Sequence, residues 1–314
     1  MPTSNRRVRI LLTGSNGRLG HELKGALGRV GEVLAPGRAD LDMRDVSSIR
    51  AVLDAARPDL IVNAAAHTDV MSAEADDTTC RAVNETAPAV LAAYCRARQA
   101  ALIHYSTDYV FDGRSDRPYR ETDVPGPINA HGRAKLGGEL AVEASGAAHL
   151  TIRCTWMYGD RGRNFVRSIL QLARERRELL VVDDQIGCPS WTRSIADATA
   201  RIVESTQRAD EPFAETLRPL AGVYHLSAAG QVNRFDFARR ILAADPVRGE
   251  QVCEHISRTS TEAYGEAALR PKYSVFDNGK IARTFGVALG SWESGLSQML
   301  SQLDHSAAST SLAM

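Results

Sequence analysis

The sequence predicts an α/β fold, namely a doubly wound parallel sheet with helices on both faces. Three observations indicate it. Short apolar runs alternate with longer helical patterns up to about residue 158. A Gly-x-x-Gly-x-x-Gly run joins the first apolar run to the first helical pattern. Beyond residue 158 the regular alternation of the two patterns changes. Alternation at this spacing is typical of βαβ units. Such sheets bind ligands beyond the carboxyl ends of their strands, so functional residues are expected there.

The expected strands are short and apolar, as strands buried on both faces of a sheet are. They span residues 8–12, 32–35, 60–64, 101–105 and 150–153. The helical patterns between them span residues 19–30, 46–56, 84–98 and 132–144. Further along, the sequence predicts a basic amphipathic helix at 164–177, a proline-containing loop at 207–222 and another strand at 223–226.

The composition is that of an ordinary soluble enzyme. Lys plus Arg and Asp plus Glu each number 38, so no net charge recruits nucleic acid or an anionic membrane. No apolar run approaches the length of a membrane span and no signal core precedes residue 8, so we expect a cytoplasmic protein. The five cysteines form no CxxC pair, which predicts reduced thiols and neither disulfides nor a metal site.

The glycine run places Gly14, Gly17 and Gly20 between the first strand and the first helix. Glycine allows the chain to turn sharply there and to approach a pyrophosphate, whose charge then meets the amino terminus of the helix. The run therefore predicts a dinucleotide site. An acid that binds the adenosine ribose is missing at the end of the second strand, where Arg38 follows instead. A guanidinium could pair with a 2′-phosphate, which favours NADPH, although a solvated loop arginine is an equal alternative.

Three segments carry a resemblance to known enzymes: the glycine run, residues 104–111 and residues 127–139. They are similar to the extended short-chain dehydrogenase/reductase superfamily, which has a Rossmann-like fold. Within it, residues 63–68, 153–158, 162–165, 183–187 and 270–271 resemble the dTDP-4-dehydrorhamnose reductase family, and the likeness extends from about residue 8 to about residue 300.

The resemblance implies NADPH as cofactor, with NADH possible, and a dTDP-linked 4-keto-6-deoxy sugar as substrate, in a monomer or homodimer. It implies that Thr107 hydrogen-bonds the keto oxygen and that Lys135 binds the ribose. The implied cofactor-binding residues are Gly14, Gly17, Arg18, Leu19, Gly20, Arg38, Asp42, Met43, Ala64, Ala65, Ala66, Tyr105 and Lys135. The implied substrate contacts are Thr68, Asp108 and Trp156 for the sugar, and Asn164, Gln185 and Arg270 for the nucleotide and its diphosphate.

Position 131 departs from the family, because His131 stands four residues before Lys135 where these reductases place a tyrosine that donates a proton. Three accounts are open. His131 could be the acid, although a lysine ammonium one helical turn away disfavours the imidazolium. It could instead act as a base in a ring-contracting reaction like that of the dihydrostreptose synthases. Alternatively, catalysis is lost, leaving a non-catalytic subunit that binds a sugar nucleotide or NADP.

The expected division of the chain into domains follows from the change in the alternation of apolar runs and helical patterns, and from the resemblance. Residues 1–160, with returns at about 187–228 and 276–302, are expected to form the dinucleotide-binding domain. A smaller substrate lobe, at about 161–186 and 229–275, is expected to interleave with it. Residues 305–314 are rich in serine and alanine and should form a frayed tail.

Overall fold

The computed structural model of the chain describes residues 7–311, and the side chains of residues 7–303. Its centre is a six-stranded sheet in the order β10-β5-β4-β3-β1-β2, and every neighbouring pair is parallel. The strands are β1 (Val8–Thr13), β2 (Gly31–Leu34), β3 (Leu60–Asn63), β4 (Ala101–Thr107), β5 (Ala148–Cys154) and β10 (Gly222–His225). The predicted strands are thus present, and the parallel α/β sheet is confirmed.

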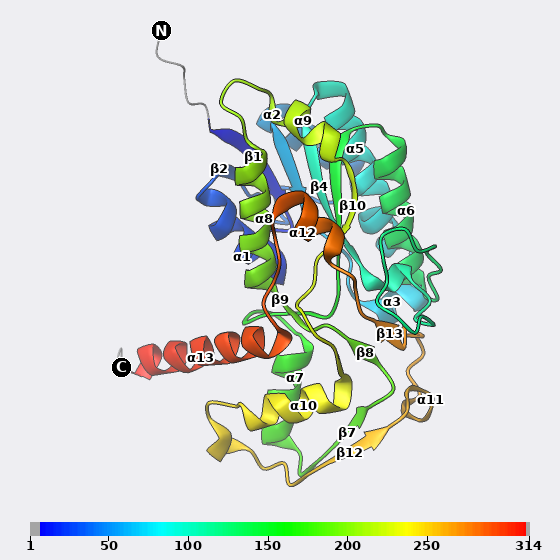
Figure 1. Cartoon of the computed structure of the whole chain (residues 1–314), viewed down its shortest axis with the longest axis vertical. Coiled ribbons are helices and arrows are strands. Elements are labelled where there is room, and N and C mark those ends of the chain that lie inside the picture. Colours follow the sequence, from blue (N-terminus) through cyan, green and yellow to red (C-terminus); the bar gives the residue numbers. More distant parts are fainter. Residues whose placement is uncertain (1–6, 312–314) are drawn as a thin grey trace.

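Helices cover both faces of this sheet (Figure 1). One face carries α1 (Arg18–Gly28), α8 (Thr192–Thr206), α9 (Phe213–Leu217) and α12 (Gly279–Phe285). The other carries α2 (Val46–Ala56), α5 (Ala87–Arg98) and α6 (Ala130–Ala144). The side chains of β1 alternate between the two layers, because Ile10 and Leu12 join the first core and Leu11 the second. This double burial explains why the strands read as continuous apolar runs.

A second region lies beside the carboxyl ends of the strands (Figure 1). Here α7 (Phe165–Glu175) packs on α10 (Arg234–Ala243), and their apolar faces share a separate core. Two small sheets complete the region: β7 (Glu178–Val182) pairs with β12 (His255–Thr259), and β8 (Ile186–Gly187) lies between β11 (Val232–Asn233) and β13 (Tyr273–Ser274). The short helix α11 (Thr261–Tyr264) follows β12.

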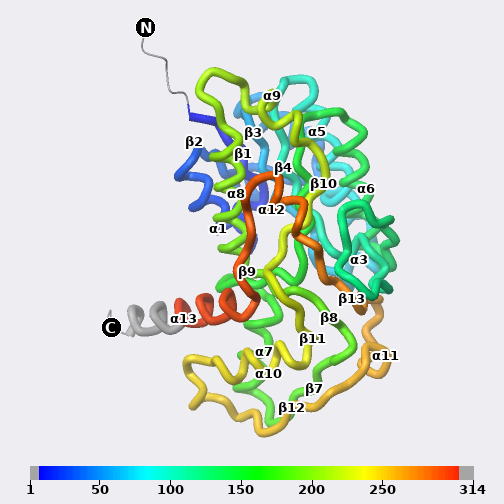
Figure 2. Tube along the Cα trace, viewed as in Figure 1, coloured from blue at the N-terminus to red at the C-terminus, as the bar shows by residue number. Residues whose placement is uncertain are grey.

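The chain passes repeatedly between the sheet and this second region (Figure 2). It leaves the sheet after β5, returns with α8 and β10, leaves again with α10 and returns with α12. The exact division into a cofactor domain and a substrate lobe stays a prediction. The remaining elements are β6 (Met157–Tyr158), β9 (Ser190–Trp191), α3 (Val70–Ala75), α4 (Thr78–Arg81), the π-helical turn Ala82–Thr86, the 3-10 turns Asp108–Val110, Arg218–Leu220 and Arg248–Glu250, and α13 (Trp292–Ser311).

One sequence-based expectation needs correction. The segment 207–222, expected to be a loop, contains α9 and a 3-10 turn, because Phe213 and Leu217 bury their side chains in the core next to α8 and the sheet. The helix α13 extends to Ser311, within the tail expected at 305–314, and residues 312–314 lie outside the described residues. That this tail is frayed stays a prediction.

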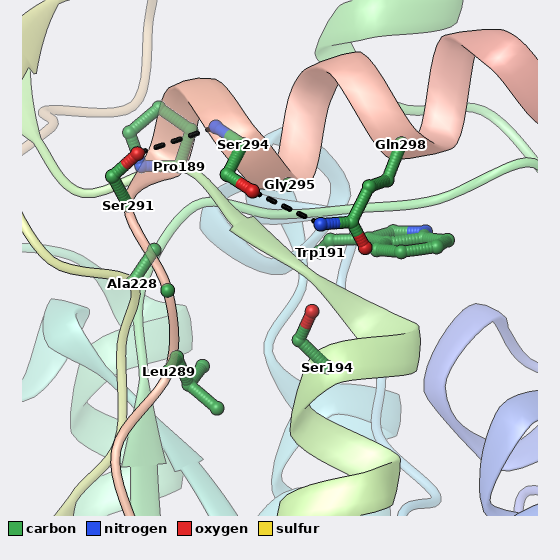
Figure 3. Close-up of a pocket in the computed structure, with 10 residues that line it drawn as sticks. Pro189, Trp191, Ser194, Ala228, Leu289, Ser291, Ser294, Gly295 and Gln298 are labelled. Carbon is green, nitrogen blue, oxygen red and sulfur yellow. Dashed lines mark hydrogen bonds between the residues drawn. The ribbon is translucent and has the colours of Figure 1, made fainter.

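The start of α13 packs on β9 and encloses a pocket of about 50 Å³ (Figure 3). Its wall includes Trp191 and Gln298, and the Gln298 amide donates to Ser294 Oγ at 2.9 Å. None of the predicted site residues lines this pocket, so it is not the predicted site. Within residues 7–311, no helix combines the length and apolar character that a membrane crossing requires.

Candidate functional site

Several of the predicted site residues lie where the sheet changes winding direction. β2 lies on one side of β1 and β3 on the other, and a ligand crevice forms at such a switch point. Gly14, directly after β1, has φ +68°, and a Cβ at this position would lie 2.6 Å from the Ala65 amide nitrogen beyond β3. The glycine loop therefore packs against residues 64–65. Both segments are predicted to bind the cofactor, so they have to lie close together.

The amino terminus of α1 is free to bind an anion. Gly17 is its N-cap and has no side chain to cap it, and the first turn contains no acidic residue. The Gly17 amide closes the loop by donating to the Gly14 carbonyl at 2.9 Å. A Cβ on Gly20 would lie 2.0 Å from the same carbonyl oxygen, so the helix can approach the loop only with glycine there. The uncapped amides and this close backbone approach fit a dinucleotide pyrophosphate.

The remaining predicted cofactor residues divide into surface and core positions. Arg18 is half-buried and donates to the Arg163 carbonyl. Leu19 and Met43 are buried in the two cores. The Tyr105 side chain is also buried, and its hydroxyl bonds Thr199 Oγ1 of α8 at 2.6 Å. The part of these three buried residues in cofactor binding stays a prediction.

Arg38 is exposed on the loop that follows β2, beside the glycine loop. Ser15 Oγ joins the two loops by donating to the Pro36 carbonyl at 3.0 Å. The neighbouring carboxylate of Asp42 is engaged by Arg44, whose hydrogen bonds lower the pKa of Asp42 to about 2. Arg38 takes part in none of the ion pairs of the described residues, so the prediction that it pairs with a 2′-phosphate of the adenosine ribose stays open to test.

Replacing Arg38 by alanine is expected to weaken NADPH binding about 10- to 100-fold and to leave NADH binding nearly unchanged, because a charge-assisted hydrogen bond to phosphate is lost. Titration of each cofactor against tryptophan fluorescence measures both constants. Arg50→Ala, an exposed arginine on α2, is the matched control. Equal losses for the two cofactors would show that Arg38 does not read the 2′-phosphate.

A buried chain of polar side chains links the ends of β1 and β3 to the middle of β4 beside this crevice. Thr13 Oγ1 donates to Asn63 Oδ1 at 2.6 Å, and Asn63 Nδ2 lies 3.0 Å from His104 Nδ1. Beyond β3, the side chain of Asn84 makes two hydrogen bonds to the backbone of His67, accepting at 3.0 Å and donating at 2.9 Å. The segment 64–68, which contains the exposed Thr68, is therefore held in place from both ends.

Lys135 occupies the centre of the site, on α6 against the end of β4. It is 3 % exposed, and its ammonium donates to the Tyr105 carbonyl at 2.6 Å. Burial lowers the pKa of Lys135 to about 8, and the carboxylate of Glu139, one turn further along the helix, opposes this. Glu139 in turn makes a bidentate ion pair with Arg153, and both side chains are 4 % exposed. Lys135 therefore keeps its positive charge at neutral pH.

His131 lies one turn before Lys135 and is 6 % exposed. Its ring meets the ring of Tyr109 edge to face, with centroids 5.7 Å apart, and Nδ1 has no hydrogen-bond partner among the described residues. Burial, and secondarily the charge of Lys135, lower the pKa of His131 to about 4. The imidazole is therefore neutral at physiological pH, which weakens the account in which an imidazolium donates the proton.

Thr107 and Asp108 end β4 on the same side of the sheet. Thr107 Oγ1 lies 3.1 Å from Asp108 Oδ1 and accepts the Tyr109 amide at 3.2 Å. Asp108 is 4 % exposed, and burial raises the pKa of its carboxyl group. The structure thus brings Thr107, His131 and Lys135 to one edge of the sheet, as predicted.

Trp156 forms a wall between the two regions. Its backbone has φ +43°, an unusual conformation for a residue with a side chain. A Cβ on Gly187 would lie 2.4 Å from the indole ring, so glycine there makes room for it. The guanidinium of Arg234 stacks on the ring, 3.5 Å from its centroid, and burial lowers the pKa of Arg234 to about 10. Arg234 is not among the residues predicted from the sequence, because it belongs to no motif and meets Trp156 only through the fold.

The three residues predicted to contact the nucleotide make hydrogen bonds or ion pairs within the protein. Asn164 caps α7 by accepting the Arg167 amide at 3.2 Å, and its own amide donates to the Gly159 carbonyl. Asn164 is thus a helix cap, and its contact with the nucleotide stays a prediction. Gln185 is buried and donates to Thr261 Oγ1 at 3.1 Å, and Arg270 pairs with Glu266 while donating to the Tyr109 hydroxyl at 3.2 Å. Among the described residues, no group of His, Cys, Asp and Glu side chains is placed to hold a metal ion.

The architecture and this arrangement of residues agree with a match to a known family. The model of the RmlD substrate binding domain matches residues 8–305. The chain belongs to this family. A dTDP-4-dehydrorhamnose reductase of Burkholderia thailandensis is 42% identical over 91% of this chain and 95% of its own length. The family predicted from the sequence is therefore confirmed.

Other relatives extend the comparison with the RmlD family. A dTDP-4-keto-6-deoxy-D-glucose reductase of Streptomyces niveus is 38% identical over 92% of this chain and 96% of its own length. The crystal structure of a Bacillus anthracis dTDP-4-dehydrorhamnose reductase in complex with NADP superposes with a TM-score of 0.83 at 31% identity, covering 94% of this chain and 99% of that one. The RmlD fold and the sequence family thus agree over nearly the whole chain.

Proposed function

We propose that this chain is an NADPH-dependent reductase of a dTDP-linked 4-keto-6-deoxy sugar. The observation that carries the proposal is that three groups lie at one edge of the sheet: the uncapped glycine loop, the buried ammonium of Lys135 and the hydroxyl of Thr107. The RmlD family model matches the chain that holds them from residue 8 to residue 305. We place the reaction in the cytoplasm and the protein as a monomer or homodimer.

The residues divide the work between cofactor and sugar. When bound, the cofactor supplies a hydride for the keto carbon. The amides of the glycine loop hold its pyrophosphate, Arg38 its 2′-phosphate and Lys135 its ribose. Thr107 holds the keto oxygen, while Trp156 closes the site beside the sugar. Lys135 and Thr107 lie on neighbouring elements, α6 and β4, so the ribose and the keto group are held in a fixed position relative to each other.

The sugar is the 4-keto sugar dTDP-4-dehydrorhamnose in this proposal, since most of the named relatives act on it by name. The Streptomyces niveus relative makes dTDP-4-keto-6-deoxy-D-glucose the second candidate. Because position 131 is not a tyrosine, two alternative functions remain: a ring-contracting reductase and a non-catalytic binding subunit. The experiment has to distinguish both from the proposed reductase.

The test is turnover with each purified sugar nucleotide, followed by the loss of NADPH absorbance and by NMR and mass analysis of the product. A six-membered 6-deoxyhexose is the expected product. A contracted ring would establish the synthase-like reaction. NADPH binding without turnover of either sugar would reject the reductase and leave a binding subunit. The same assay with NADH in place of NADPH measures the cofactor preference.

A further inference from the structure

The reduction of a ketone needs a proton for its oxygen, and the residue expected to supply it is poorly suited. The His131 imidazole is neutral at physiological pH and is buried beside the ammonium of Lys135. A neutral imidazole is a far weaker acid than an imidazolium. If the chain is the reductase proposed above, another group has to provide the proton.

Asp108 lies in an environment that disfavours its carboxylate form. Its nearest polar neighbours are the hydroxyls of Thr107, Thr155 and Ser274, and its Oδ2 has no hydrogen-bond partner within the described residues. The charged and titratable groups that face it are Arg234 from α10, the Tyr109 hydroxyl, and the thiols of Cys154 and Cys188. None of them makes an ion pair with Asp108, and burial raises its pKa.

The hydrogen bonds around Thr107 give an independent reason for a protonated Asp108. A hydroxyl has one hydrogen and two lone pairs. If Asp108 were ionised, the single hydrogen of Thr107 would point to Asp108 Oδ1, 3.1 Å away, and could not reach a substrate. If Asp108 carries the proton, it donates to Thr107 Oγ1, the Tyr109 amide occupies the second lone pair, and the Thr107 hydrogen is free for a keto oxygen.

We propose that Asp108 is the proton source of this enzyme and that it acts through the hydroxyl of Thr107. As the new C–H bond forms at the keto carbon, the Thr107 O–H bond breaks and its proton passes to the keto oxygen. Thr107 Oγ1 takes the Asp108 proton in the same step, so Asp108 ends as a carboxylate. After the alcohol leaves, water returns a proton along the same path, because Thr107 is only half-buried.

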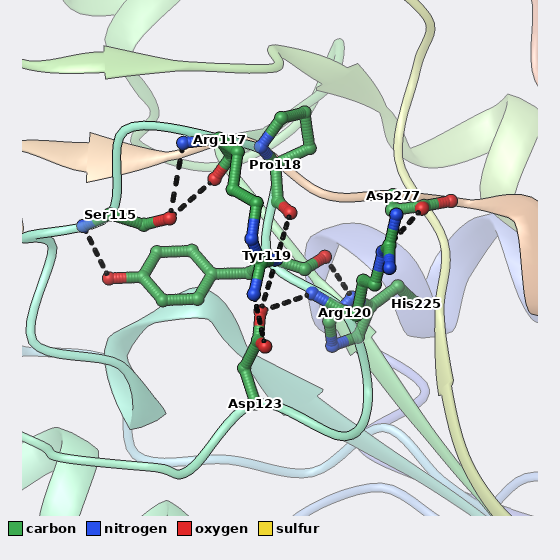
Figure 4. A network of polar contacts seen from close by, with 8 residues as sticks. All are labelled: Ser115, Arg117, Pro118, Tyr119, Arg120, Asp123, His225 and Asp277. Carbon is green, nitrogen blue, oxygen red and sulfur yellow. Dashed lines mark hydrogen bonds and ion pairs between the residues drawn. The ribbon is translucent and has the colours of Figure 1, made fainter.

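The segment that contains Ser274 is itself held in place. Ser274, which faces Asp108, follows Tyr273 in β13, and the Tyr119 amide donates to the carbonyl of the next residue, Val275, at 2.8 Å. Figure 4 shows the polar contacts around Tyr119, including the 2.8 Å ion pair of Arg117 with Asp123 and the ion pair of Arg120 with Asp277. The contacts of Tyr119 and Arg120 tie the segment after β13 to the loop at 115–123.

The first variant is Asp108→Asn, which keeps the shape and the hydrogen bond to Thr107 but has no transferable proton. We expect kcat to fall about 100- to 10,000-fold with NADPH binding unchanged. In the wild type, kcat should decline as pH rises through the pKa of Asp108, and this decline should be absent in the variant. The exposed Asp116→Asn is the matched control, with both rate and profile unchanged.

The second variant separates proton donation from a purely structural role. Adding His131→Tyr to Asp108→Asn places a phenol where the family has its proton donor, so kcat should recover by about tenfold or more. If Asp108 only held the sugar or the fold, the phenol would restore nothing. Two protons move in the proposed step, so the dependence of the wild-type rate on the deuterium content of the solvent should be curved.

Three results would overturn the proposal while leaving the reductase intact. The first two are a fall in kcat of less than about tenfold in Asp108→Asn and no recovery of kcat in the double variant. The third is that kcat no longer declines at high pH in His131→Phe, which would assign the acid to His131. Absence of wild-type turnover with either sugar would overturn the proposed function and this inference together.

Discussion

Replacement of Lys135 by methionine is expected to remove most turnover and to stabilise the fold at neutral pH. Turnover should fall about 100-fold or more, because the ribose loses the group that orients it against the keto carbon. The folded protein releases the Lys135 proton at about pH 8, against 10.5 for an exposed lysine. Below pH 8 both states are protonated, and burial of the ammonium costs the folded state about 3 kcal/mol.

The sign of the pH dependence follows from this difference. Between pH 8 and 10.5 the unfolded chain binds more protons than the folded one, so the free energy of unfolding of the wild type should rise with pH. Methionine removes the cost and also the hydrogen bond to Tyr105, worth about 1 kcal/mol, which leaves a net gain of about 2 kcal/mol at neutral pH. The gain should shrink as pH rises.

Urea denaturation of wild type and variant at neutral pH and at about pH 9.5 measures this difference. The exposed Lys24→Met should change neither stability nor its pH dependence. A variant that is less stable than the wild type at neutral pH would contradict the burial cost of Lys135, even if its activity were lost as expected.

Breaking the buried ion pair of Glu139 and Arg153 is expected to destabilise the fold by about 3 to 5 kcal/mol, because the remaining charge has no partner and little solvent. Glu139→Leu leaves the Arg153 guanidinium unpaired between the sheet and the ring of Phe111, which lies 5.0 Å from it. Since Glu139 also favours the ammonium form of Lys135, the pKa of Lys135 should be lower in this variant than in the wild type.

A double-mutant cycle separates the pair from its surroundings. Glu139→Leu and Arg153→Met should each be strongly destabilising, whereas the double variant should be within about 2 kcal/mol of the wild type, because apolar side chains of similar size replace both charges. Chemical denaturation gives all four free energies. Simple additivity of the two losses would show that the pair does not act as a unit.

The sheet could be predicted because each of its strands carries its own signal. The apolar runs at β1 and β3 are local, and the glycine run at 14–20 specifies a turn that only glycine permits. The helix α9 could not be recognised in the same way, since its five residues are helical chiefly because Phe213 and Leu217 find the core between α8 and the sheet. The short strands β8, β11 and β13 exist only through their pairing with distant segments.

The site could be predicted in its residue types but not in its protonation states. The positions of Lys135 and Thr107 follow from the motif, and the structure brings them together. That Asp108 is buried beside Ser274, or that Arg234 stacks on Trp156, depends on contacts between residues far apart in the sequence. Asn164, a predicted nucleotide contact, also caps a helix, and the sequence alone does not show which hydrogen bonds its side chain makes.

The outermost strand of the sheet has a consequence for biosynthesis. β5 ends at Cys154, but the strand that covers its outer edge, β10, begins only at Gly222. A nascent chain emerging from the ribosome therefore carries an open, apolar strand edge until α7, β7 and α8 have also been synthesised, and open edges are where chains aggregate. The six-stranded sheet is therefore incomplete until β10 has been synthesised. Truncation before Gly222 should yield insoluble protein, and a chaperone would have to cover β5 during translation.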